Sequence, residues 1–216
     1  MNVLVLSSSP RRNGNSRLLA EALLEGVDEA GHRGALAHVD DHVTSFLRDC
    51  RGCRGADGRC RIEDGFEALL LERVLPADAV VFATPLYWYG VSGQLKTFLD
   101  RIFCYIAASY PGAAEVVEGL SHKRLALLIS SEETYVGASL GVLHEIQEYA
   151  RYTHSALVGV VNGIGNKRGD VLADPADPID RARTLGRRLF ELKATDYRID
   201  TDRPGSVWGV GPQTPD

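Results

Sequence analysis

The chain has 216 residues, of which 44% are hydrophobic and 25% charged, and its formal net charge is -5. This composition is ordinary for one sizeable globular domain, and the mild negative charge argues against a general nucleic-acid-binding protein. No apolar run approaches the roughly 18–20 residues of a membrane span and the N-terminus lacks a secretory signal, so we expect no membrane association and a cytoplasmic location.

Short apolar runs alternate with segments of helical periodicity along the chain. The runs predict strands buried on both faces, and the periodic segments predict amphipathic helices. Five strands that each lead into a helix predict an α/β fold, a doubly wound five-stranded parallel sheet with helices on both faces. In chain order we expect strand 2–7, a helix from about 18 that ends at Gly31, strand 35–39, helix 63–75, strand 78–84, helix 92–103, strand 123–130, helix 138–152, strand 155–161 and helix 178–193.

The loop after the first strand, within "LVLSSSPRRNGNS" (4–16), is unusually rich in hydrogen-bond donors. Ligands of doubly wound sheets bind beyond the carboxyl ends of the strands, and a loop that enters a helix N-terminus is a natural phosphate cradle. An N-capped surface turn would need only one such donor. The sequence therefore predicts a phosphate site, although the nucleotide-hydrolase and dinucleotide glycine motifs are absent. Its candidate residues are Ser9, Arg11, Asn13, Gly14, Asn15 and Ser16.

The loop after the third strand, "ATPLYWYGVSG" (83–93), is aromatic rather than polar. Three adjacent aromatic residues, 87–89, cannot all enter one core, so at least one should face a cleft or a partner. Pro85, Leu86, Tyr87 and Trp88 could form a wall for a flat heterocycle such as a flavin. The alternative is a core aromatic cluster. The charged residues 96, 100 and 101 are spaced for an ion-pair network on a helix.

The loop after the fourth strand, "SSEETYVGAS" (130–139), offers Ser131 and Tyr135 as further contacts. It overlaps a formal G-x-S-x-G motif at 137–141. A nucleophile elbow must turn directly off a strand and be followed by its acid and histidine in that order. Here several polar residues separate the strand from the serine, and the only later histidines are His144, one helical turn on, and His154, so we interpret the two glycines as easing the start of a helix.

Two of these motifs resemble those of the flavodoxin-like NAD(P)H-dependent FMN reductases and the iron–sulfur flavoproteins. "SSPRRNGNS" is similar to the family form G-S-P-R-x-x-G/S-N-[ST], with Ser8 in place of the usual glycine. The segment 85–101 matches P-x-Y-W/F-x-x-x-S/P-x-x-x-K-x-F-x-D-R. The resemblance extends to about residue 190. It implies a flavodoxin-like fold, FMN as cofactor with its phosphate at Ser9, Arg11, Asn15 and Ser16, and NADPH or NADH as reductant.

The cysteines of "CRGCRGADGRC" (50–60) depart from the iron–sulfur pattern. Iron–sulfur flavoproteins carry C-x2-C-x2-C and a fourth cysteine here, whereas this chain has Ala56 at the third position. Three thiolates cannot complete a four-cysteine cluster, and zinc would need His42 or Cys104 as a fourth ligand. We therefore expect no metal. A redox disulfide between Cys50 and Cys53 stays open.

The domain prediction is a flavin-binding domain over 1–195, with an insertion at about 104–122, and a tail over 196–216. The insertion and the tail hold more apolar residues than a solvated loop needs, which predicts an interface. Related flavoproteins commonly pair near the flavin, so we expect a homodimer, or a dimer of dimers, with the insertion or the tail at the neighbour's site.

These observations favour an FMN-dependent oxidoreductase that passes hydride from NAD(P)H to a quinone, a flavin or another small electron acceptor. The cofactor carries this chemistry, so we assign binding residues and no catalytic residue. Two alternatives stay open: an electron carrier of the flavodoxin type, and a flavin-site enzyme of specialised biosynthesis.

Overall fold

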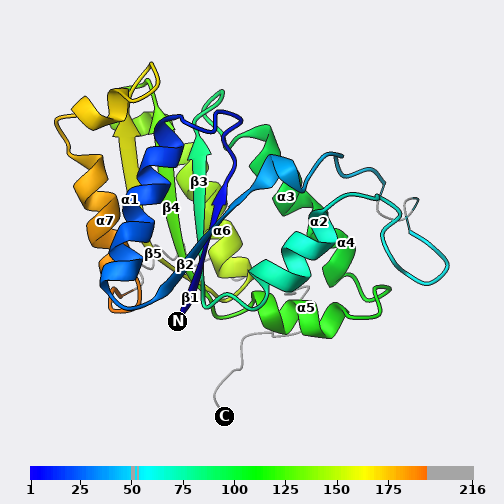
Figure 1. Ribbon diagram of the computed structural model, residues 1–216. Helices are drawn as coiled ribbons and strands as arrows, with labels where there is room; N and C mark the ends of the chain where they lie inside the picture. Colours follow the sequence, from blue (N-terminus) through cyan, green and yellow to red (C-terminus); the bar gives the residue numbers. More distant parts are fainter. Residues whose placement is uncertain (50–51, 53, 194–216) are drawn as a thin grey trace, which may run out of the picture.

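Five parallel strands form one sheet in the order β2-β1-β3-β4-β5 (Figure 1). This computed structural model describes residues 1–49, 52 and 54–193. The order reverses between β1 and β3, and such a switch point is where doubly wound sheets bind their ligands. The predicted fold class is confirmed. The strands are β1 (Asn2–Ser7), β2 (Arg33–His38), β3 (Ala79–Pro85), β4 (Arg124–Ser131) and β5 (Ala156–Ile164).

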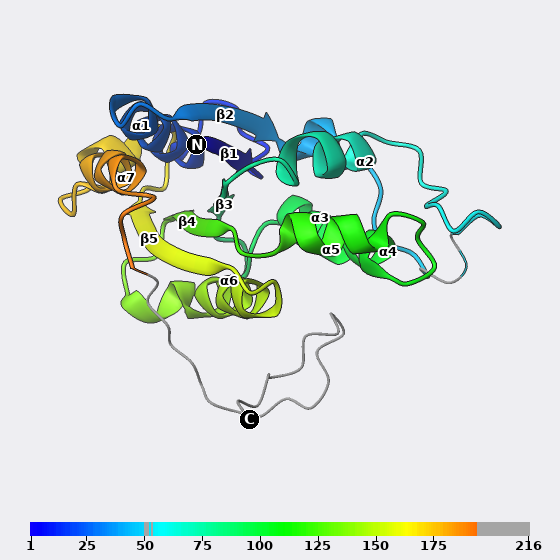
Figure 2. The same cartoon turned by 90° about the horizontal axis from the view of Figure 1, so that it is seen from below.

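Helices cover both faces of the sheet because successive strand residues point to opposite sides. Val3 and Val5 of β1 belong to the core beneath α1 (Asn15–Glu29) and α7 (Pro178–Arg187). Leu4 and Leu6 belong to the core of the other face. Figure 2 shows the two layers from below the sheet. The second layer contains α2 (Phe66–Ala68) with η2 (Leu69–Val74), α3 (Gly93–Arg101) and α6 (Leu140–Tyr152).

The insertion after α3 folds into two short helices, α4 (Phe103–Ile106) and α5 (Ala113–Leu120). Most of its large apolar side chains are buried in the chain's own core, whereas Phe103 is 51% exposed. The chain's own core therefore accounts for the buried side chains, and the interface predicted at the insertion or the tail stays a prediction. The predicted tail, 196–216, lies outside the described residues. The buried side chains are Cys104, Tyr105, Tyr110, Val116 and Leu120.

Two of the predicted helices differ clearly from the sequence expectation. The helix predicted at 63–75 begins at Phe66, and its second half, η2, is a π-helix. The last helix, α7, ends at Arg187 rather than at 193. The G-x-S-x-G segment lies across η3 (Val136–Ser139) and the first turn of α6, so the helix-start interpretation holds. Two further short elements are η1 (Val39–Asp41) and η4 (Asp170–Ala173).

A buried ion pair closes the base of the long segment between η1 and α2. Arg101 of α3 is fully buried and donates to Asp64, with Nη2 2.9 Å from Oδ1. The guanidinium lies 4.4 Å from the ring centre of Phe66 and donates to the carbonyl of Ser45. The Asp64 carboxylate also accepts the backbone N–H groups of Thr44 and Phe66. Arg101 thus ties both ends of the cysteine-bearing segment to α3.

The predicted ion-pair network on α3 is present but extends beyond the helix. Lys96 pairs with Asp100 one turn later, whereas Arg101 pairs across to Asp64. Burial disfavours the charged form of Asp64, but its hydrogen bonds from Arg101 and the backbone outweigh burial and lower the pKa of this carboxyl group. Within the described residues, no helix is both long and apolar enough to cross a membrane.

Candidate functional site

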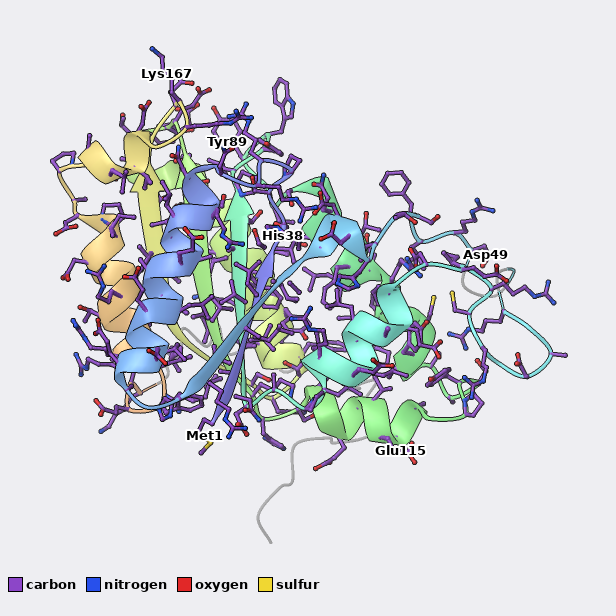
Figure 3. The ribbon with its side chains drawn as sticks, viewed as in Figure 1. Met1, His38, Asp49, Tyr89, Glu115 and Lys167 are labelled. Carbon is purple, nitrogen blue, oxygen red and sulfur yellow. The ribbon has the colours of Figure 1, made fainter. Side chains whose placement is uncertain are left out.

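The loops that follow β1, β3, β4 and β5 lie together at the carboxyl edge of the sheet (Figures 1 and 3). Hydrogen bonds join each loop to the next. Ser92 Oγ, after β3, donates to the carbonyl of Ser8 (3.0 Å), and the Leu86 N–H donates to the carbonyl of Ser130 (2.8 Å). The Gly165 N–H, after β5, donates to Ser131 O (2.8 Å). The edge is therefore one connected platform.

The first loop leaves the N-terminus of α1 open to an anion. Gly14 is the N-cap, and among the described residues no side chain caps the helix. Its first N–H groups therefore lack the partner that a serine or aspartate cap would supply. A Cβ on Gly14 would lie 3.1 Å from Arg11 Cβ and 3.2 Å from Arg11 O, so a side chain here would crowd the loop. This geometry fits a bound phosphate.

The side chains of this loop divide into free and engaged groups. Arg11 and Asn13 are exposed, and no described residue pairs with the Arg11 guanidinium. Ser9 is buried, and its Oγ accepts the N–H of Arg11 at 3.2 Å, which fixes the turn. Ser16 is also buried and its Oγ lies 2.7 Å from Ser130 Oγ. Free cationic and backbone donors thus surround the helix end, while the serines hold the loop.

Asn15 contacts the loop after β5. Its Nδ2 donates to the carbonyls of Gly165 (2.9 Å) and Lys167 (3.0 Å), and its Oδ1 accepts the N–H of Gly169 (2.9 Å). All three bonds run to one neighbouring loop. Asn15 therefore lies at the predicted site, but its side chain already uses its hydrogen-bonding atoms to hold the loop after β5 against the first loop.

Arg12 is turned away from the first loop toward the end of β2. It pairs with Asp40 (3.0 Å) and with Asp41 (2.7 Å). The hydrogen bond from Arg12 lowers the pKa of Asp41, and the bond to Asp41 raises the pKa of Arg12. Asp40, at the position where a dinucleotide fold would hold a ribose, is instead part of this surface ion pair.

The loop after β3 forms a tight turn that presents aromatic side chains. Pro85 is buried and Leu86 half-buried, whereas Tyr87, Trp88 and Tyr89 are 43%, 97% and 49% exposed. The sequence argument required at least one of these three aromatic residues to lie outside the core, and in the structure none of them enters it. Both Trp88 and Tyr89 have left-handed backbone, with φ of 48° and 59°. Such strain in non-glycine residues concentrates at functional sites.

The loop after β4 supports this aromatic turn. Tyr89 donates its hydroxyl to Glu133 Oε1 (3.3 Å), and its ring centre lies 6.5 Å from that of Tyr135, which is 52% exposed. The hydroxyl of Tyr135 and the charge of Glu133 raise the pKa of Tyr89 to about 12. With its pKa raised, the Tyr89 hydroxyl stays neutral and can donate a hydrogen bond. A Cβ on Gly141 would lie 2.7 Å from Tyr89 O, so only glycine allows α6 to pack this closely against the turn.

Ser131 differs from Tyr135, the other residue predicted in this loop. It is buried, and its Oγ donates to the carbonyl of Glu133 (3.1 Å). The backbone of Ser131 holds the β5 loop, as described above. Sequence reasoning missed that loop, 165–169, although its glycines and charged residues after a buried strand were a readable signal.

The cysteine segment shows no metal-binding cluster in the part that is described. Cys50 and Cys53 lie outside the described residues, so their predicted redox pairing stays a prediction. Cys60 is half-buried and Cys104 buried. Among residues 1–49, 52 and 54–193, no three His, Cys, Asp or Glu side chains are placed to hold a metal ion.

The described geometry agrees with comparison to known proteins. A family model for the flavodoxin-like fold matches residues 1–161. The chain belongs to this family. A Bacillus subtilis protein named as an NAD(P)H-dependent FMN-containing oxidoreductase is 27% identical over 174 residues, which cover 81% of this chain and 91% of the relative. An iron–sulfur flavoprotein of Archaeoglobus fulgidus is 29% identical over 212 residues, covering 93% and 84%.

Two further relationships support the same assignment. An FMN-dependent NADH:quinone oxidoreductase of Paraburkholderia phymatum is 31% identical over 140 residues, covering 60% of this chain and 69% of the relative. The solved structure of a Trp repressor binding protein from Bacillus subtilis superposes with a TM-score of 0.62 at 21% identity, covering 88% of this chain and 98% of that one. The resemblance to FMN reductases and iron–sulfur flavoproteins is thereby confirmed.

Proposed function

We propose that this chain is an FMN-dependent oxidoreductase that takes hydride from NADPH or NADH and reduces a quinone, a flavin or another small acceptor. The observation that carries the proposal is the open N-terminus of α1 beside a strained aromatic turn, joined by the hydrogen bond from Ser92 to Ser8. For a quinone, NAD(P)H and one proton would be converted to NAD(P)+ while the quinone becomes a hydroquinone.

The phosphate end of the cofactor would lie against the first turn of α1. Backbone N–H groups and the helix dipole favour a dianion there, and Arg11 offers a free guanidinium for charge-assisted hydrogen bonds. Asn13 and Gly14 complete the loop. Ser9, Asn15 and Ser16 would act on the phosphate through the backbone positions that their side chains fix.

The aromatic turn and the β4 loop would hold the ring. Pro85 and Leu86 bring the backbone to the switch point, and Tyr87 and Trp88 offer aromatic faces. Ser131 and Tyr135 belong to the second wall. When bound, FMN supplies an acceptor for hydride and a donor of electrons, so the protein's part is to bind, orient and exclude water.

A comparison of FMN with riboflavin tests the site. Flavin fluorescence quenching would give the dissociation constant of each ligand for the unmodified protein and for Arg11→Gln. We expect Arg11→Gln to weaken FMN about tenfold, because a hydrogen bond to a charged group contributes about 1.5 kcal/mol. Riboflavin, which lacks the phosphate, should be unaffected. Arg33→Gln removes another exposed positive charge, at the opposite end of the strands, and is the control.

Anaerobic addition of NADPH or NADH to the FMN-loaded protein then separates enzyme from carrier. Bleaching of the flavin absorbance by either coenzyme is the result expected for an oxidoreductase. FMN that binds but is not reduced would favour a flavodoxin-type carrier. No uptake of FMN would refute the proposal altogether.

The proposal includes a homodimer, or a dimer of dimers. Its support is the exposed aromatic ridge at Tyr87, Trp88 and Tyr89, since large apolar groups gathered at one edge commonly mark an interface. A monomeric mass in sedimentation at micromolar concentration would refute this part.

A further inference from the structure

The loop after β5, residues 165–169, is hydrogen-bonded to the first loop. The three hydrogen bonds from Asn15 reach its beginning, middle and end, at Gly165, Lys167 and Gly169. The Gly165 N–H is bound to Ser131 O at the same time. These contacts use backbone groups of the loop. Its side chains are therefore free to serve a ligand without being needed for the fold.

Lys167 and Arg168 are the cationic residues of this loop. Both are exposed, and Figure 3 shows Lys167 pointing away from the carboxyl edge of the sheet. Neither side chain forms an ion pair with a described residue. The nearby carboxylates are occupied by backbone donors: Asp170 Oδ2 accepts the N–H of Lys167 and Asp174 Oδ2 that of Ile164, each at 2.7 Å. Two positive charges are thus presented next to each other at this edge.

The two arginines that precede the first helix differ in whether a carboxylate pairs with them. Arg12 is neutralised by Asp40 and Asp41, whereas Arg11 is free and is assigned to the flavin phosphate. The pair at 167–168 is consequently a second cationic group, separate from the first and joined to it through Asn15. Such a group is suited to a second anionic group on a ligand that binds at this edge.

We propose that Lys167 and Arg168 bind the 2′-phosphate of NADPH and make it the preferred reductant; the inference rests on the proposed function. The β5 loop borders the proposed flavin site, because Asn15 of the first loop is hydrogen-bonded to Gly165, Lys167 and Gly169, so a coenzyme bound at this edge would have the two cations within its reach. The 2′-phosphate is a terminal group carrying nearly two negative charges at neutral pH. Two adjacent cations match it better than the singly charged phosphates of the pyrophosphate bridge.

The double variant Lys167→Gln/Arg168→Gln tests this assignment, with Arg33→Gln as the control for loss of an exposed positive charge elsewhere on the surface. Calorimetric titration of FMN-saturated protein with adenosine 2′,5′-bisphosphate and with adenosine 5′-monophosphate isolates the 2′-phosphate without turnover. We expect the unmodified protein and the control to bind the bisphosphate about tenfold more tightly, and the double variant to lose that difference. The KM for NADPH should rise about tenfold in the double variant, with kcat and the KM for NADH unchanged.

The outcomes separate this inference from the proposed function. Equal losses for NADPH and NADH, or equal binding of the two adenosine phosphates by the unmodified protein, would overturn the 2′-phosphate assignment and leave the oxidoreductase intact. A chain that takes up no FMN would refute the proposed function instead. The bisphosphate titration can also be made without cofactor, so it decides the assignment in either case.

Discussion

Trp88 is expected to lower the stability of the fold that carries it. Trp88 and Tyr89 form the centre of a turn closed by two hydrogen bonds between Tyr87 and Gly90, at 3.1 and 3.0 Å. With φ positive at both central residues, this turn is of the kind that prefers Asn-Gly. Left-handed backbone raises the free energy of an L-residue by roughly 1–2 kcal/mol. Since the Trp88 side chain is 97% exposed, burial returns little of that cost.

Replacing Trp88 by asparagine, which tolerates left-handed backbone, should therefore raise the free energy of unfolding by about 1 kcal/mol. For a chain of this size that corresponds to a Tm about 2–4 °C higher. Thermal unfolding of the cofactor-free protein, followed by circular dichroism, measures the shift. Phe46→Asn is the control, because Phe46 is 75% exposed without left-handed backbone, and it should change Tm little.

The same Trp88→Asn variant should bind FMN more weakly and oxidise NADPH more slowly, since Trp88 is proposed to contact the ring. Higher stability with lower activity is the expected trade at a strained functional position. An unchanged or lower Tm would refute the strain argument, and full activity in a stabilised variant would refute the assigned role.

Two further predictions concern buried charges. Arg101→Met leaves the Asp64 carboxylate buried without its partner and should cost about 3–5 kcal/mol in denaturant unfolding, whereas the double variant Arg101→Met/Asp64→Leu should cost clearly less; costs that simply add would contradict the pairing. Burial lowers the pKa of Lys123 to about 8 from an ordinary 10.5, so between these pH values the unfolded chain binds more protons and the free energy of unfolding should rise with pH. Lys123→Met should lack that rise in unfolding measured from pH 7 to 11, and equal slopes in the two proteins would exclude the effect.

Local sequence signals were sufficient for the sheet. Buried strands read as continuous apolar runs, and helices read as apolar residues three and four apart, because each pattern reports the faces that an element must bury. The order of strand and helix then limits the topology through right-handed crossovers. The first loop was readable for a similar reason: donors, a glycine and a following helix are contiguous in the chain.

Tertiary structure decided which of those donors are free. Asn13 and Asn15 have the same side chain, yet Asn15 is hydrogen-bonded to a loop about 150 residues away in the sequence. Likewise, Arg12 forms ion pairs with carboxylates after β2, whereas Arg11 does not. Sequence spacing carries no information on such distant pairings. The same limit hid the role of Arg101, whose partner Asp64 lies in another segment, and the packing of Tyr105 and Tyr110 in the chain's own core.

The sequence by itself determined the sheet, its carboxyl edge and the chemical character of the loops there, because these follow from local periodicity and composition. Only the folded chain decided the left-handed aromatic turn, the hydrogen bonds of Asn15 to the loop after β5 and the second cationic group at 167–168. Those features depend on contacts between loops that meet in space only after the strands have been ordered in the sheet.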